Sequence, residues 1–210
     1  SGDFTEVEKA DETVLHAVLD ELGVKASDIL QTNGVIWVEG PSDRIFINKW
    51  ISLNDSSLKE GINYSIMFYG GKLLSHLTAN ITETEIEEET NDFIKLAKLN
   101  RNMAVIIDSD KKNEDDSINA TKERIKREIT QNNDRAIVWI TDGKEIENYI
   151  PSSMFEKVLG IKGMSDYTII STLDEKYNKV DGAKSLVKEM TSEFLKDNAL
   201  LEKKVSELVE

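Results

Sequence analysis

The 210-residue sequence contains no cysteine and only two histidines, which excludes a disulfide framework and thiolate metal sites. It has only two prolines, and neither these nor the scattered glycines mark a flexible linker between domains. No apolar stretch approaches the roughly 20 residues needed to cross a bilayer, and residues 1–9 do not resemble a signal peptide. We therefore expect a cytoplasmic protein that makes no contact with membranes.

Basic residues are also scarce, because 26 Lys and Arg face 40 Asp and Glu and give a net charge of −14. Proteins that bind nucleic acid usually contact phosphates through a basic surface. Two explanations are compatible with a nucleic-acid role: divalent ions bridge carboxylates to phosphate, or another domain supplies the basic surface. The third interpretation is an acidic protein with no nucleic-acid role.

Short apolar runs separated by helical patterns predict an α/β fold. Strands are predicted at residues 34–40, 62–69, 103–110 and 135–141, and helices at 6–22, 41–53, 71–77 and 117–129. Residues after Pro151 show helical patterns and no further strand, and the acidic segment 83–92 is predicted as a solvated connection. Nearly continuous apolar strands alternating with helices indicate a parallel sheet of about four strands, covered on both faces.

The stretch YGGKLLSHL, residues 69–77, superficially resembles a nucleotide-binding P-loop. Leu73 follows Lys72 where the P-loop needs Ser or Thr, and the first glycine of G-x-x-x-x-G-K is absent. We interpret the paired glycines as a tight turn into a helix, with a phosphate contact by Lys72 as the less favoured alternative. His16 and His76 have no second ligand at metal spacing and are interpreted as packing or surface residues.

Acidic residues follow three of the four predicted strands. They are Glu39 and Asp43 after the first strand, Asp108 and Asp110 after the third, and Glu145 and Glu147 after the fourth. Ligand sites in parallel sheets collect beyond the carboxyl ends of the strands, where these acids would repel one another unless cations compensate. Their hard oxygen atoms suit Mg²⁺, Mn²⁺ or Ca²⁺ rather than Zn²⁺.

Each acid also has a simpler interpretation when it is taken alone. Asp43 could favour the N-terminus of its helix, Asp110 could be solvated in a loop, and Asp142-Gly143 reads as a turn. Three groups that converge on one edge of a sheet are harder to explain in this way. The sequence therefore predicts a metal site at that edge.

Four segments together resemble the Toprim fold of topoisomerases, primases and related nucleases. They are VEGPSDRIFINKWI, INYSIMFYGGKLLSHL, VIIDSD and KEIENYI. More narrowly, they resemble the C-terminal nuclease region of OLD-family (overcoming lysogenisation defect) ATP-dependent endonucleases. The resemblance covers residues 34–150 as a Toprim catalytic core, between an N-terminal helical segment (1–33) and a helical C-terminal region (151–210) that completes the active site.

The resemblance implies metal-dependent DNA cleavage in phage defence or DNA processing, with two Mg²⁺ or Mn²⁺ ions and Ca²⁺ as a non-productive occupant. The implied metal ligands are Glu39, Asp43, Asp108, Asp110, Glu145 and Glu147. Glu39 and Asp108 are also implied as catalytic, together with a lysine for which Lys179 is preferred and Lys184 is second. Family members commonly carry an ATPase domain, so we expect an ATPase domain or subunit outside this chain, with oligomerisation through that region.

Three other functions share parts of this pattern. A topoisomerase or primase has the same fold but needs further catalytic domains that the chain has no room for. A phosphoacceptor receiver domain needs an acidic pair after the first strand and a lysine after a fifth strand. A Toprim-like regulatory or binding module without nuclease activity is the third alternative, and the acid cluster makes it less attractive.

Overall fold

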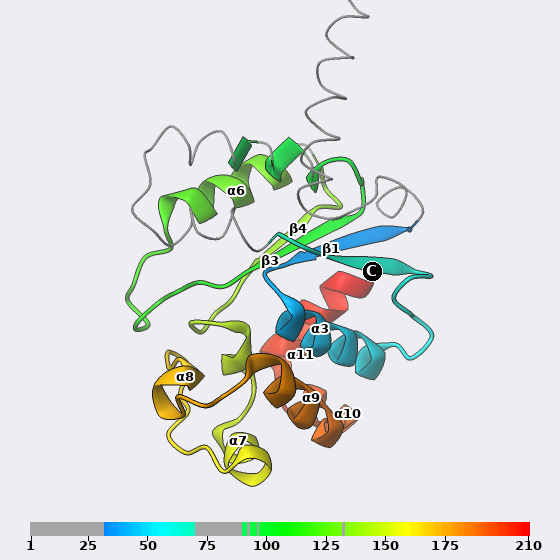
Figure 1. Cartoon of the computed structure of the whole chain (residues 1–210). Coiled ribbons are helices and arrows are strands. Elements are labelled where there is room, and N and C mark those ends of the chain that lie inside the picture. The colour runs from blue at the N-terminus through cyan, green and yellow to red at the C-terminus, as the bar shows by residue number, and fades with distance from the viewer. Residues whose placement is uncertain (1–31, 70–89, 92, 96, 132) are drawn as a thin grey trace, which may run out of the picture.

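The computed structural model describes residues 32–69, 90–91, 93–95, 97–131 and 133–210 of the chain. Its centre is a sheet of parallel strands in the order β2-β1-β3-β4 (Figure 1). The strands are β1 (Gly34–Val38), β2 (Tyr64–Phe68), β3 (Met103–Ile107) and β4 (Ile137–Ile140). The α/β class and the parallel sheet of four strands that the sequence predicts are confirmed.

The strands form where apolar runs can be buried on both faces. Every residue of β3 is buried, and so are four of the five residues of β1. Helices on both faces account for this, because a strand that faces no solvent has no reason to alternate apolar and polar residues. Pairing of Val38 with Phe68 and of Ile107 with Ile140 brings the carboxyl ends of the strands to one edge.

Helices cover the two faces of the sheet unequally (Figure 1). The helix α6 (Ala120–Thr130) covers one face, and α3 (Pro41–Asn54), α9 (Lys179–Glu189) and α11 (Ala199–Val209) lie on the other. The remaining short helices are η1 (Ile146–Tyr149), α7 (Ser152–Leu159), α8 (Ile170–Leu173) and α10 (Ser192–Lys196). The fully described stretch 151–210 contains no strand, as the sequence predicts.

One hydrophobic cluster joins the sheet to the C-terminal helices. Trp50 of α3 stacks on Phe46 with ring centroids 5.7 Å apart and lies 6.3 Å from the ring of Trp139 on β4. Phe155 of α7 and Leu201 of α11 belong to the same cluster and are fully buried. Burial of such side chains is worth about 1.5–3 kcal/mol each. The C-terminal helices are therefore held firmly against the face of the sheet that α3 covers.

Local capping groups set where the helices begin. The sequence predicts a helix from residue 117, whereas α6 starts at Ala120 because the Asn119 side chain accepts a hydrogen bond from the Thr121 amide at 2.7 Å. At α3, Pro41 occupies the first turn and Asp43 accepts a hydrogen bond from the Gly40 amide at 2.9 Å.

Some predictions fall outside the described residues. These are the helices at 6–22 and 71–77, nearly all of the acidic segment 83–92, and the side chains of His16, Lys72 and His76. Of the helices in the described part of the chain, none combines the length and apolar character that crossing a bilayer requires.

Candidate active site at the carboxyl edge of the sheet

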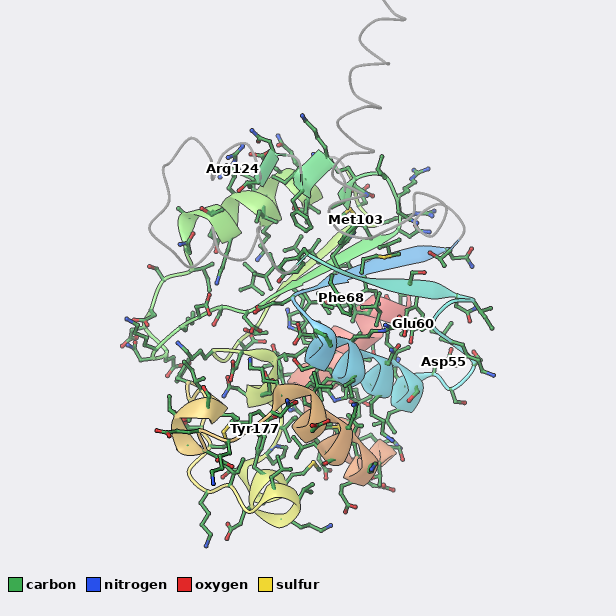
Figure 2. The ribbon with its side chains drawn as sticks, viewed as in Figure 1. Asp55, Glu60, Phe68, Met103, Arg124 and Tyr177 are labelled. Carbon is green, nitrogen blue, oxygen red and sulfur yellow. The ribbon has the colours of Figure 1, made fainter. Side chains whose placement is uncertain are left out.

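The strand order places the predicted acids at a single edge. Glu39 directly follows β1 and Asp108 directly follows β3, which pairs with β1. Glu145 and Glu147 lie at and within η1, a short turn after β4. In Figure 2, Met103 lies on the side of the sheet that α6 covers, and Phe68 and Tyr177 lie on the side of α3 and α9.

The first pair of acids comes from β1 and the start of α3. Asp43 is 8% exposed, and its carboxylate accepts hydrogen bonds from the Gly40 amide and from the Ser42 hydroxyl at 3.3 Å. Asp43 thus performs the helix-capping role that its position suggests. The same side chain still belongs to the site, because its charge acts on both Glu39 and Asp108.

The loop after β3 is bound to the turn after β4 by hydrogen bonds. The Ile146 amide donates to the Asp108 carboxylate at 3.0 Å. The Ser109 amide donates to the Thr141 hydroxyl at 2.8 Å, and the Ser109 hydroxyl donates to the Gly143 carbonyl at 2.7 Å. The second and third acid groups are therefore parts of one hydrogen-bonded unit.

Asp110 closes the loop after β3 in an unusual conformation. Its φ of 59° lies in the left-handed region, which few residues other than glycine adopt. Its side chain is 51% exposed and forms an ion pair with Lys122 of α6. Among the predicted ligands, Asp110 is therefore the most solvated, and a lysine already holds its carboxylate.

The third group of acids surrounds a lysine from the C-terminal region. The Lys179 ammonium lies 2.7 Å from the Glu145 carboxylate and 3.7 Å from that of Glu147. Glu147 is fully buried, and neither of its carboxylate oxygens has a hydrogen-bond partner. Lys184, the second candidate, is 59% exposed and pairs with Asp181 at 3.5 Å, so Lys179 is the lysine that reaches the acids.

Burial and mutual repulsion make several of these acids hard to ionise. Burial, and next the charge of Asp43, raise the pKa of Glu39 to about 7, although Lys179 acts to lower it. Burial also raises the pKa of Glu147 to about 7, with Lys179 again opposing and Glu145 adding to the rise. Because each acid strengthens its neighbours' proton affinity, the cluster is electrostatically strained without a further cation.

The pKa values of Asp108 and Lys179 are both raised by the neighbouring negative charges. Burial raises the pKa of Asp108 well above its usual range, and the charges of Asp43 and Glu39 raise it further. Burial alone would lower the pKa of Lys179, but the charges of Glu147 and Glu145 outweigh it and raise that pKa well above its ordinary value. Lys179 is therefore a permanent cation, and it neutralises only part of the site.

The donor atoms of the edge fit a hard divalent cation. In the described part of the chain, no set of three or more His, Asp or Glu side chains is arranged to hold one ion together. Mg²⁺, however, usually binds through one or two carboxylates, with waters and substrate phosphates completing its shell. The unpartnered oxygens of Glu147 and the partly buried Glu39 are donors of this kind. The residues fit an ion held by few carboxylates rather than by a closed cage.

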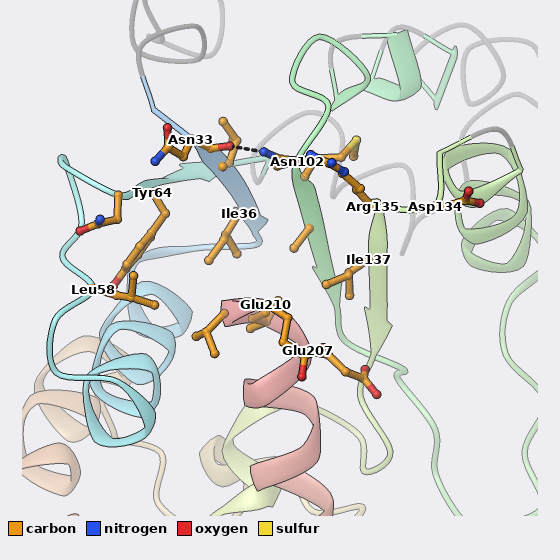
Figure 3. A pocket seen from close by; sticks show the side chains of 17 residues that line it. Asn33, Ile36, Leu58, Tyr64, Asn102, Asp134, Arg135, Ile137, Glu207 and Glu210 are labelled. Carbon is orange, nitrogen blue, oxygen red and sulfur yellow. Dashed lines mark hydrogen bonds between the residues drawn. The ribbon is translucent and has the colours of Figure 1, made fainter.

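A hollow of about 790 Å³ opens at the opposite edge, where the strands begin (Figure 3). Ile36, Tyr64 and Ile137 line it, and the Asn102 side chain donates to the Asn33 carbonyl at 2.8 Å on its rim. The hollow contains none of the predicted site acids. We place the candidate site at the acid edge, because sites in parallel α/β sheets lie beyond the carboxyl ends of the strands.

Sequence reasoning missed Lys122, which contacts the acid loop from α6. A signal for it exists in the sequence, because Lys122, Ile125 and Ile129 share helical spacing and all three are buried. A lysine on the apolar face of a helix needs an acceptor close by.

Comparison of the chain with family models, with curated proteins and with solved structures finds no match.

Proposed function

We propose that the chain is a metal-dependent DNA endonuclease, the Toprim catalytic region of an OLD-family nuclease that acts in phage defence or DNA processing. The observation that carries the proposal is that three acid groups, separate in sequence, lie at the carboxyl edge of the sheet, where Lys179 pairs with Glu145 and Glu147 and its charge also acts on Glu39 and Asp108. A helix cap or a solvated loop explains one acid, but not a fully buried Glu147 whose carboxylate accepts no hydrogen bond and has the Lys179 ammonium 3.7 Å away.

The acids of the edge would hold Mg²⁺ or Mn²⁺, each ion bound by one or two of the carboxylates of Glu39, Asp108 and Glu147, with water and substrate phosphate completing its shell. When bound, such ions activate water and stabilise the charge that develops during phosphodiester hydrolysis. The chain's contribution is to fix these carboxylates in place. The Ile146 amide orients Asp108, and the first turn of α3 orients Asp43. A preorganised site of this kind avoids rearrangement at the moment of reaction.

Lys179 would contribute positive charge beside the scissile phosphate. The Lys179 side chain is 43% exposed, so an incoming phosphate can approach it. Its partners Glu145 and Glu147 are the acids that a metal ion would engage. Release of Lys179 from Glu145 on metal binding would turn a counter-ion into a group that binds phosphate.

A cleavage assay tests this function. The purified chain is incubated with supercoiled plasmid in Mn²⁺, in Mg²⁺ and in EDTA, beside the variants Asp108→Asn and Asp116→Asn. Asp116 is a half-buried acid of the loop before α6, and its carboxylate accepts hydrogen bonds from the neighbouring Lys112 amide and Asn113 side chain, so its variant removes the same charge without touching the site acids. We expect nicking in Mn²⁺ by the parent and by Asp116→Asn, none in EDTA, and none by Asp108→Asn.

The assay also separates the alternatives. Equal nicking by Asp108→Asn would refute the proposed site. Metal-dependent DNA binding without any cleavage by the parent would favour the regulatory or binding module. The chain is acidic overall, so we propose that an ATPase domain or subunit outside it supplies most of the attraction to DNA, and the oligomeric contacts as well.

A further inference from the structure

Lys122 is a buried cation in contact with the acid loop. The residue is 2% exposed, on the face of α6 that packs against the sheet with Ile125 and Ile129. Lysine is rarely buried to this degree without specific acceptors, since an unpaired ammonium is costly to remove from water. The groups that accept hydrogen bonds from the Lys122 ammonium therefore indicate the role of this residue.

In the part of the chain that the structure describes, the two acceptors of the Lys122 ammonium lie in the loop that follows β3. It donates to the main-chain oxygen of Asp108 at 2.8 Å and forms an ion pair with the carboxylate of Asp110. These two contacts span the loop from its first acid to its last. In between, the Ser109 amide and hydroxyl are bound to Thr141 and Gly143. The loop is thus clamped from α6 on one side and from the turn after β4 on the other.

The clamp acts at the point where the backbone is least favourable. Asp110 has a φ of 59°, in the left-handed region that favours glycine and that aspartate tolerates better than most other residues. Its own amide donates to the Lys144 carbonyl at 3.0 Å, and the Lys144 ammonium donates back to the Asp110 carbonyl at 3.2 Å. The contact of Lys122 is the one that fixes the Asp110 side chain, because the bonds with Lys144 reach only its backbone.

We propose that Lys122 is a positioning residue that holds the Asp108–Asp110 loop in the conformation that binds the metal ion. The inference rests on the proposed function in so far as the edge binds a divalent cation. Lys122 itself has no contact with Glu39, nor with Lys179 and its partners Glu145 and Glu147. It therefore acts on the site through the loop. Partners that orient metal ligands typically change metal affinity about 10–100-fold when they are lost.

The test measures Mn²⁺ affinity of the whole chain, by calorimetry or by the electron paramagnetic resonance signal of free Mn²⁺. The variants are K122M, which keeps the apolar stem without the charge, and K122R, which keeps the charge and its donors. The matched control is K126M, one turn further along α6, where the lysine is exposed. Far-UV circular dichroism and a cooperative melt establish that each variant is folded.

We expect K122M to raise the Kd for Mn²⁺ about tenfold or more, K122R to restore most of the affinity, and K126M to match the parent. A folded K122M with a lower melting temperature and a parent-like Kd would overturn the inference, because it would make Lys122 a purely structural residue. If K122M does not melt cooperatively, K122Q decides by the same criterion, since it is neutral, shorter and still able to donate.

The two proposals fail in different ways. A parent chain that binds no Mn²⁺ would overturn both the metal site and the role of Lys122. A parent that binds Mn²⁺ but never cleaves DNA would overturn only the nuclease function, and the difference between K122M and K126M in Mn²⁺ affinity would still support the positioning role.

Discussion

Replacing Glu147 by glutamine should change how the stability of the metal-free protein depends on pH. Glu147 is fully buried, and its carboxylate oxygens have no hydrogen-bond partner. Burial raises its pKa from 4.5 to about 7 even though Lys179 opposes the rise. Between these two values the folded protein holds a proton that the unfolded chain has already released.

The sign and size of the effect follow from this difference. Because the folded state holds the proton of Glu147 more tightly, the contribution of Glu147 to the free energy of unfolding falls as pH rises from about 4.5 to about 7 and is level outside this window. A carboxyl whose pKa moves from 4.5 to about 7 loses about 3 kcal/mol over the window. In Glu147→Gln this loss is absent, so the variant should gain about 3 kcal/mol relative to the parent between pH 5 and pH 8.

The assay is urea unfolding in EDTA at about pH 5 and about pH 8, followed by the fluorescence of the buried Trp37, Trp50 and Trp139. The buried amide of the new glutamine also costs free energy, about 1–3 kcal/mol, but this cost is the same at both pH values and cancels in the comparison. Glu39, whose pKa is also raised, contributes equally to parent and variant. Glu175→Gln, at an exposed position, is the control.

The reasoning is refuted if parent and Glu147→Gln lose stability in parallel between the two pH values. Such a result would mean that Glu147 has an ordinary pKa in the folded protein. Its carboxylate would then be hydrated or hydrogen-bonded in solution, and its burial would not indicate a metal ligand. A variant that loses more stability than the parent between the two pH values would refute it as well, since the sign of the Glu147 contribution would be reversed.

Three further outcomes are expected. Lys179→Met should reduce nicking by about 100-fold or more while DNA binding falls only slightly, whereas Lys184→Met should cut like the parent; equal losses in cleavage and binding would make Lys179 an ordinary phosphate contact. Gly143→Ala should lose about 1–3 kcal/mol in urea unfolding, because its new Cβ would lie 2.5 Å from the Asp166 carbonyl, while Gly40→Ala meets no atom within 4 Å and serves as the comparison. The isolated chain should bind DNA weakly without divalent ions and more tightly with Mn²⁺, measured by fluorescence anisotropy; tight binding in EDTA would reveal a basic surface that the sequence does not indicate.

The strands, and their burial on both faces, could be predicted because the local pattern of apolar residues determines them. The run Met103–Ile107 is apolar without interruption, which only a strand covered on both faces accommodates in so short a length. The edge at which Glu39, Asp108 and Glu147 meet could also be predicted, since all parallel strands end there. These inferences need only the direction of each strand and the general rule for sites in such sheets.

The contacts within the site could not be predicted, because they depend on packing between distant elements. Nothing in the sequence around Lys122 shows that α6 brings it to the loop after β3. The choice between Lys179 and Lys184 is likewise open, since the two lysines lie five positions apart in similar surroundings, and only the docking of α9 on α3 decides which one reaches Glu145. Side-chain identity gives the chemistry, whereas tertiary packing gives the geometry.

The central claim is that the acid edge binds divalent metal ions. The most direct measurement is anomalous X-ray scattering from a crystal of the chain soaked in Mn²⁺. The account predicts at least one anomalous peak within bonding distance of Glu39, Asp108 or Glu147, with the Lys179 ammonium moved away from Glu145. Manganese bound only at other acids of this highly charged surface, with the carboxyl edge of the sheet free of metal, would contradict it.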